Sequence, residues 1–93
     1  MISWDDAKNA SNQRKHGVSF EVAALVFDDP AHVSRQDRIE AGESRWQTIG
    51  RVGDTVLLLV AHTWHDAKDG EHIRIISARC ATQFERKIYE QGT

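Results

Sequence analysis

The feature that most constrains this 93-residue chain is an apolar run near its middle, Val-Leu-Leu-Leu-Val-Ala at positions 56–61. Because the run has no polar side to turn toward water, it is typical of a strand covered on both faces. Gly53-Asp54 before the run predicts a tight hairpin, and alternation over residues 45–52 predicts the strand that pairs with it. We therefore predict that residues 55–64 form the centre of an antiparallel sheet.

Shorter patterns on both sides complete the predicted fold. Asp5 or Asp6 can cap a helix that ends at His16, and apolar residues three and four apart predict a second helix over residues 20–27. Further expected elements are a weak strand over 31–35, loops over 37–42 and 65–70, a last strand over 73–77, and a C-terminal helix capped by Thr82. The predicted fold class is α+β in a single domain over residues 1–93: two N-terminal helices, an antiparallel β-meander of about four strands, and a C-terminal helix.

Charge and hydropathy exclude several classes of protein. The chain has 12 Lys and Arg against 14 Asp and Glu, so its net charge of −2 gives no overall positive field for nucleic acid. Positive charge gathers only locally, around Arg14-Lys15 and over residues 73–89. No apolar run approaches the roughly 18 residues that span a bilayer, and the N-terminus is acidic where a secretion signal is basic. We expect a cytoplasmic protein with no membrane contact.

The cysteine and histidine residues favour neither a metal-binding site nor a catalytic nucleophile. The single cysteine, Cys80, can form no internal disulfide, and its place between the last strand and the last helix predicts a small buried thiol. His62 and His65 could share a zinc ion only if their strand ended by Trp64, because strand residues three apart point to opposite faces. We predict no metal site and no cofactor.

The remaining polar residues suit metal-free cleavage of RNA. The 2′-hydroxyl of RNA can attack the adjacent phosphate, so an enzyme must supply a proton acceptor, cations for the charged phosphorane, and a proton for the leaving oxygen. The candidate catalytic residues are Lys15, His16, Glu43, Arg45, Arg74 and Arg79.

Roles within this set follow from side-chain chemistry. Arg74 and Arg79 are expected to hold phosphate through their forked guanidinium groups. Their odd spacing of five puts them on opposite faces of a continuous strand, so they share a site only if the strand ends near Ser77. Lys15 and His16 are candidates for proton transfer, with helix capping as the alternative for His16, and Glu43 is a base or an orienting partner.

A set of motifs, in order over nearly the whole chain, resembles the BrnT toxins of type II toxin–antitoxin systems. The motifs are Trp4-Asp5, Arg14-Lys15-His16-Gly17-Val18-Ser19-Phe20-Glu21, Val26-Phe27-Asp28-Asp29-Pro30, Glu43-Ser44-Arg45-Trp46, and the segment from Ile73 to Arg79. The resemblance implies a RelE-like ribonuclease that acts on RNA to inhibit translation. It also implies a BrnA-type antitoxin, with two toxins on an antitoxin dimer, and contact with operator DNA only through that antitoxin.

Two positions depart from the pattern of this family. Cys80 stands where a second arginine commonly follows Arg79, and His65 stands where the preceding strand often ends in arginine. Each change removes a cation near the expected RNA-binding face. The alternative function is therefore a non-catalytic protein that binds its antitoxin and acts as co-repressor of its own operon.

Overall fold

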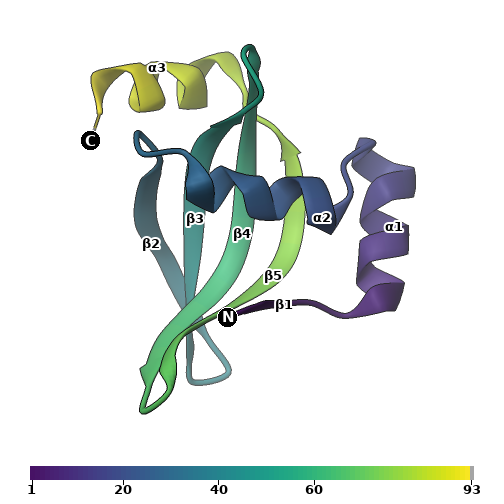
Figure 1. The fold of residues 1–93 in the computed structure, drawn as a ribbon, viewed down its shortest axis with the longest axis vertical. Helices are drawn as coiled ribbons and strands as arrows, with labels where there is room; N and C mark the ends of the chain where they lie inside the picture. Colours follow the sequence, from purple (N-terminus) through teal and green to yellow (C-terminus); the bar gives the residue numbers. More distant parts are fainter. Residues whose placement is uncertain (93) are drawn as a thin grey trace.

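The computed structural model describes residues 1–92, and a five-stranded sheet with strand order β1-β5-β4-β3-β2 forms its centre (Figure 1). The strands are β1 (Ile2–Ser3), β2 (Val33–Glu40), β3 (Glu43–Val52), β4 (Val56–Ala67) and β5 (Gly70–Cys80). The helices are α1 (Asp6–His16), α2 (Phe20–Ala23), the 3₁₀ helix η1 (Ala24–Asp28) and α3 (Gln83–Gln91). Strand β4 carries the apolar run and lies between β3 and β5, as predicted.

The α+β class is confirmed, but the predicted arrangement of elements needs correction. The chain begins on a strand, because β1 pairs in parallel with β5 through Ile2 opposite Ile73 and Ser3 opposite Arg74. The sheet is therefore mixed and has five strands in place of an antiparallel meander of about four. The second helix is also shorter than predicted, since α2 ends at Ala23 and continues as η1. A strand as short as β1 has no visible alternation, and its partner lies far along the chain.

Two segments predicted as loops are strands. β2 continues to Glu40, so only Ala41 and Gly42 form the turn into β3, and both have positive φ angles of 52° and 78°. β4 continues to Ala67 and β5 starts at Gly70. Residues in both hairpin ends are polar and largely exposed, so main-chain pairing with the neighbouring strand defines these segments without any hydrophobic period.

One face of the sheet is covered by α2 and η1, and we call it the helix face, while α1 lies beside β5 (Figure 1). Val18, Phe20, Ala23 and Val26 from the helical segment pack there against β4 and β5 residues Leu58, Val60, Ile75 and Ala78. Glycine at position 50 allows η1 to approach β3, since a Cβ atom there would lie 2.6 Å from Cγ1 of Val26. The helix face holds the main apolar core.

Both ends of α1 are capped, and a polar side chain within the helix binds it to β5. Asp5 caps its N-terminus by accepting from the Lys8 N–H at 3.0 Å, and Gly17 ends it with a φ of 71°, as predicted. The buried Asn12 side chain accepts from the Ala78 N–H at 3.1 Å and donates to the Ala78 carbonyl at 2.8 Å. Its amide thus pairs with the outer edge of β5 as a neighbouring strand would.

The cysteine prediction is wrong. Cys80 is the last residue of β5, and its side chain is exposed. Among residues 1–92, no helix is long and apolar enough to cross a membrane.

Candidate nucleic-acid interface

A β-bulge in β5 brings Arg74 and Arg79 to the same face of the sheet. Ala61 of β4 pairs with Ser77 and His62 pairs with Ile75, which leaves Ile76 as an extra residue. Arg74 then lies opposite Thr63, and Arg79 lies opposite Leu59. Thr63 and Leu59 are an even number of residues apart on β4, so their partners share one face. We predicted that the two arginines share a site only if the strand ends near Ser77. The strand instead continues to Cys80, and the bulge at Ile76 brings them to one face by changing the alternation of side chains.

The same face carries arginines from β2, β3 and β5, and we call it the arginine face. A second bulge, at Asp37 in β2, keeps Arg35 and Arg38 together on it in the same way. The register places on this face Arg35, Arg38, Arg45, Arg51, Arg74 and Arg79. It is the side of the sheet opposite the helix face.

The strand register aligns Arg38, Arg45, Thr63 and Arg74 in one row that crosses β2, β3, β4 and β5. Adjacent strands are about 4.8 Å apart, so the α-carbons of Arg45 and Arg74 are on the order of 10 Å apart. Long guanidinium side chains from both sides can therefore reach one phosphate group above Thr63. This row is the part of the arginine face best suited to an anion.

Helix α3 covers one end of the arginine face and leaves the other end open. Ile49, Leu57 and Leu59 are buried at the covered end, with exposed fractions of 2%, 3% and 4%. The Tyr89 hydroxyl of α3 donates to Asp29 at 2.7 Å, and the Arg51 guanidinium lies 5.6 Å from the Tyr89 ring centre. The row of Arg45 and Arg74 lies toward the opposite end of the sheet, beyond these apolar residues.

Arg79 anchors α3. Its guanidinium donates to both carboxylate oxygens of Glu85 at 2.8 and 2.9 Å. Glu85 also completes the N-terminal capping box of α3, because it accepts from the Thr82 N–H at 2.8 Å. The hydrogen bonds from Arg79 lower the pKa of Glu85 to about 2. The fork expected to hold phosphate is occupied by this carboxylate.

Among the described residues, Arg45 and Arg74, unlike Arg79, are not held in a close bidentate pair with a carboxylate. Arg45 forms a long ion pair with Glu40, with 3.7 Å between Nη2 and Oε2. Within residues 1–92, its buried Nε has no hydrogen-bond partner. Arg74 is exposed beside Thr63. Glu43 is exposed at the start of β3, on the same face as Arg45 and opposite Glu40.

Lys15 and His16 lie at the outer edge of β5. Both line a shallow cavity that also includes Ser77, whose row lies between those of Arg74 and Arg79. His16 is the last residue of α1, directly before the Gly17 cap, in the last helical turn that also holds Lys15. The structure thus places these two residues beside the arginine face and not within the row of arginines.

The two histidines considered for zinc point away from each other. Because β4 continues through Trp64 to Ala67, His62 lies on the helix face and His65 lies on the arginine face. Among the described residues, no group of three or more His, Cys, Asp or Glu side chains could hold a metal ion.

Comparisons with known proteins place these features in a family. No curated protein matches the chain. The crystal structure of the Brucella abortus ribonuclease toxin, BrnT, matches with a TM-score of 0.58 and 22% identity, covering 89% of this chain and 100% of that one. This likeness establishes the fold. A family profile described as "Ribonuclease toxin, BrnT, of type II toxin-antitoxin system" matches residues 4–85.

The chain belongs to the BrnT family. The family description is that of a ribonuclease toxin in a type II toxin–antitoxin system, which implies an RNA target and an antitoxin partner. The matched residues of this BrnT-family chain include all strands of the arginine face and the Arg79–Glu85 pair.

A histidine pair on the arginine face of this BrnT-family chain was not predicted from the sequence. His65 and His72 lie opposite each other, two residues beyond Thr63 and Arg74 on the same face, and their rings stack with centres 5.5 Å apart. The His72 Nε2–H donates to Asp69 at 3.0 Å, and this bond lowers the pKa of Asp69. A hairpin centred on Lys68-Asp69 pairs these positions, so a correctly placed turn would have revealed them.

Proposed function

We propose that this BrnT-family chain is a metal-independent endoribonuclease whose arginine face cleaves RNA and thereby inhibits translation. One observation carries the proposal: Arg45 and Arg74 flank Thr63 in a single row on the arginine face. Two permanent cations at this spacing can hold one phosphate and stabilise the extra charge of a phosphorane.

Proton transfer is assigned to His72. In the mechanism proposed here, the RNA 2′-hydroxyl attacks the adjacent phosphorus and the bond from phosphorus to the 5′ oxygen breaks, which leaves a 2′,3′-cyclic phosphate and a 5′-hydroxyl. The protein therefore has to accept the 2′ proton and supply a proton to the leaving 5′ oxygen, without supplying a nucleophile. His72 lies two residues from Arg74 on the same face, and its bond to Asp69 fixes the orientation of the imidazole ring. Nδ1 remains for the substrate when Nε2 donates to Asp69. His65 stacks on the same ring and limits its movement.

Lys15 and His16 have a different role in this mechanism. They line the edge of β5 beside Ser77, outside the row of arginines, where a lysine can hold the RNA backbone by charge. Glu43 borders Arg45 at the open end of the face. Glu40 and Glu43 set the acidic boundary of the site, and Arg79 positions α3 through Glu85.

The partner proposed for this face is a BrnA-type antitoxin. An acidic surface on that antitoxin would neutralise the arginine row and block RNA at the same place. In the proposed complex two toxins bind an antitoxin dimer, and operator DNA is contacted by the antitoxin alone.

The experiment is to induce the chain in bacteria and to assay the purified protein on RNA. Growth should slow and cellular RNA should be cut, with rescue when the antitoxin is co-expressed. In vitro cleavage should persist in excess EDTA and should stop on an RNA whose 2′-hydroxyls are replaced by hydrogen. Normal growth with intact RNA at high soluble expression would contradict the ribonuclease and leave the co-repressor function. Loss of cleavage in EDTA with recovery on added magnesium or zinc would contradict the metal-free mechanism.

A further inference from the structure

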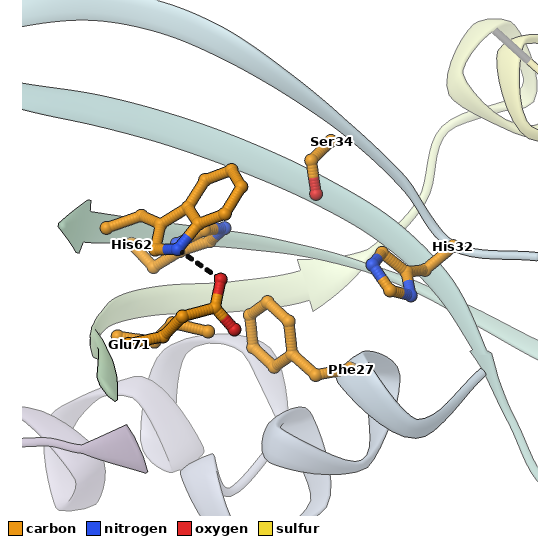
Figure 2. Close-up of a pocket in the computed structure, with 7 residues that line it drawn as sticks. Phe27, His32, Ser34, His62 and Glu71 are labelled. Carbon is orange, nitrogen blue, oxygen red and sulfur yellow. Dashed lines mark hydrogen bonds between the residues drawn. The ribbon is translucent and has the colours of Figure 1, made fainter. Parts of the chain in front are cut away.

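A second concave site lies on the helix face, where η1 and β2 approach β4 and β5 (Figure 2). Its volume is about 130 Å³, which is comparable to an engineered cavity of roughly 150 Å³ that binds benzene. We call it the aromatic pocket, and the side chains that matter for its chemistry are Phe27, His32, Ser34, His62, Trp64 and Glu71. The pocket is on the opposite side of the sheet from the arginine face.

A chain of hydrogen bonds at the base of this pocket has only one possible direction. The buried His62 donates from Nδ1 to the Thr63 carbonyl at 3.0 Å, since a carbonyl can only accept. Burial lowers the pKa of His62 and favours the neutral ring, so Nε2 accepts from the Thr48 hydroxyl at 2.7 Å. The Thr48 oxygen then accepts from the Ser34 hydroxyl at 2.7 Å. The proton of Ser34 is therefore already used.

The other donors of the pocket are used in the same way. Trp64 donates its indole N–H to Oε2 of Glu71 at 2.8 Å, the contact drawn in Figure 2. His32 donates from Nδ1 to the Asp29 carbonyl at 2.7 Å. What faces the pocket is then a pair of acceptors, the Ser34 oxygen and Oε1 of Glu71.

We propose that the aromatic pocket binds an organic cation that carries N–H donors, either a guanidinium or an alkylammonium group. The Glu71 carboxylate supplies the opposite charge, and the free acceptors match the N–H groups of the ligand. Aromatic rings attract such cations, and the Phe27 and His62 rings meet edge to face at 5.0 Å in the wall of the pocket. A free polyamine and an arginine or lysine side chain of a partner protein share this chemistry.

The test is an NMR titration of the ¹⁵N-labelled full chain with methylguanidinium, with sodium acetate as the matched anion. A saturable shift of the Trp64 indole N–H with methylguanidinium, and none with acetate, is expected. 1,4-Diaminobutane and a blocked arginine amide are titrated in parallel. Tighter binding of 1,4-diaminobutane would indicate a free polyamine as the ligand, and tighter binding of the arginine amide would indicate a side chain of a partner protein. No saturable shift with any cation, or an equal response to acetate, would overturn the proposal.

Glu71→Gln gives the sharper comparison, because glutamine can still accept from Trp64 but has no charge. Loss of a charged hydrogen bond should weaken cation binding about tenfold or more. Ser34→Ala should also weaken it, and Asp54→Asn in the β3–β4 turn is the control that keeps wild-type affinity. Unchanged affinity in Glu71→Gln would overturn the assignment. RNA cleavage should be unaffected by Glu71→Gln, so failure here is separate from failure of the ribonuclease.

Discussion

At the scale of single residues, two arginines that the sequence treats alike have different surroundings. Arg74 is exposed in the row with Arg45 and Thr63, whereas Arg79 is bonded to Glu85 through both ends of its fork. Removing Arg79 leaves the Glu85 carboxylate, whose side chain is only 13% exposed, without its cation. The two positions should therefore separate stability from activity.

We predict that Arg79→Ala lowers the thermal transition by at least about 4 °C, since removing a charged hydrogen bond costs about 1–3 kcal/mol in a domain of this size. Arg74→Ala should leave the transition within about 1 °C of wild type, because an exposed charge contributes little to stability. Differential scanning calorimetry of both variants checks this. Equal transitions for the two variants would show that the Arg79–Glu85 pair does not hold α3.

The pKa of Glu85 gives a prediction on pH. The pKa of Glu85 in the folded protein is about 2, below its ordinary value of 4.5. The contribution of the Glu85 carboxylate to folding stability is therefore complete above about pH 4.5 and is lost as the pH falls toward 2. The stability difference between wild type and Glu85→Gln should therefore be largest near neutrality and shrink below pH 4.5. Glu90→Gln, at an exposed position on the same helix, is the control and should track wild type throughout. A difference that stays constant down to pH 2 would rule out Arg79 as the cause.

At the scale of elements, Asn12 connects α1 to the sheet along the outer edge of β5. Its side chain bonds the N–H and the carbonyl of Ala78, and it also donates to the Val18 carbonyl at 2.9 Å. Asn12→Ala should cost about 1–3 kcal/mol in urea denaturation, because it leaves buried main-chain groups without partners. Gln13→Ala, exposed on the same helix, should cost less than about 0.5 kcal/mol. Equal costs would contradict this role of Asn12.

The elements that the sequence predicts well are those with local signals. The cap at Asp5, the stop at Gly17, the cap at Thr82 and the apolar run of β4 are all found as expected. β1 was missed because its partner strand lies far along the chain, and the bulge at Ile76 was missed because it depends on the exact register of the β4–β5 hairpin. The bulge matters most, since it decides that Arg74 and Arg79 share a face.

The candidate site was predicted in residue type but only partly in arrangement. Arg45, Arg74 and Glu43 do share the open end of one face, and Lys15 and His16 border it at the edge of β5. The capping box of Thr82 and Glu85 could have been inferred from their spacing, whereas the pairing of Glu85 with Arg79 required the structure. The His65–His72 pair required the hairpin register.

At the scale of the whole molecule, the net charge is −2, but the charged residues are distributed unequally between the two faces of the sheet. Arginines gather on one face, and the aromatic pocket on the other presents acceptors and a carboxylate. RNA binding should therefore depend on salt despite the negative net charge, because a few phosphate contacts release counterions.

The salt dependence of RNA affinity tests whether the arginine face is the surface that binds RNA. In a plot of log affinity against log salt concentration for a single-stranded RNA, Arg45→Ala and Arg74→Ala should each make the slope less steep by about 0.7, because each variant neutralises one phosphate fewer. Arg86→Ala, exposed on α3, should keep the wild-type slope. Identical slopes for all variants would place the RNA elsewhere on the molecule.

The single-turnover rate of RNA cleavage by Arg74→Ala, measured against wild type on the same fluorogenic RNA, tests the central claim most directly. Arg74 is exposed and lies in the row proposed to hold the phosphate, so the rate should fall about 10²-fold, the effect of removing one charge-stabilising donor. The thermal transition should not change, and Arg74→Lys should recover only part of the rate, since it keeps the charge but not the fork. A rate within twofold of wild type in a folded Arg74→Ala variant would contradict cleavage on the arginine face.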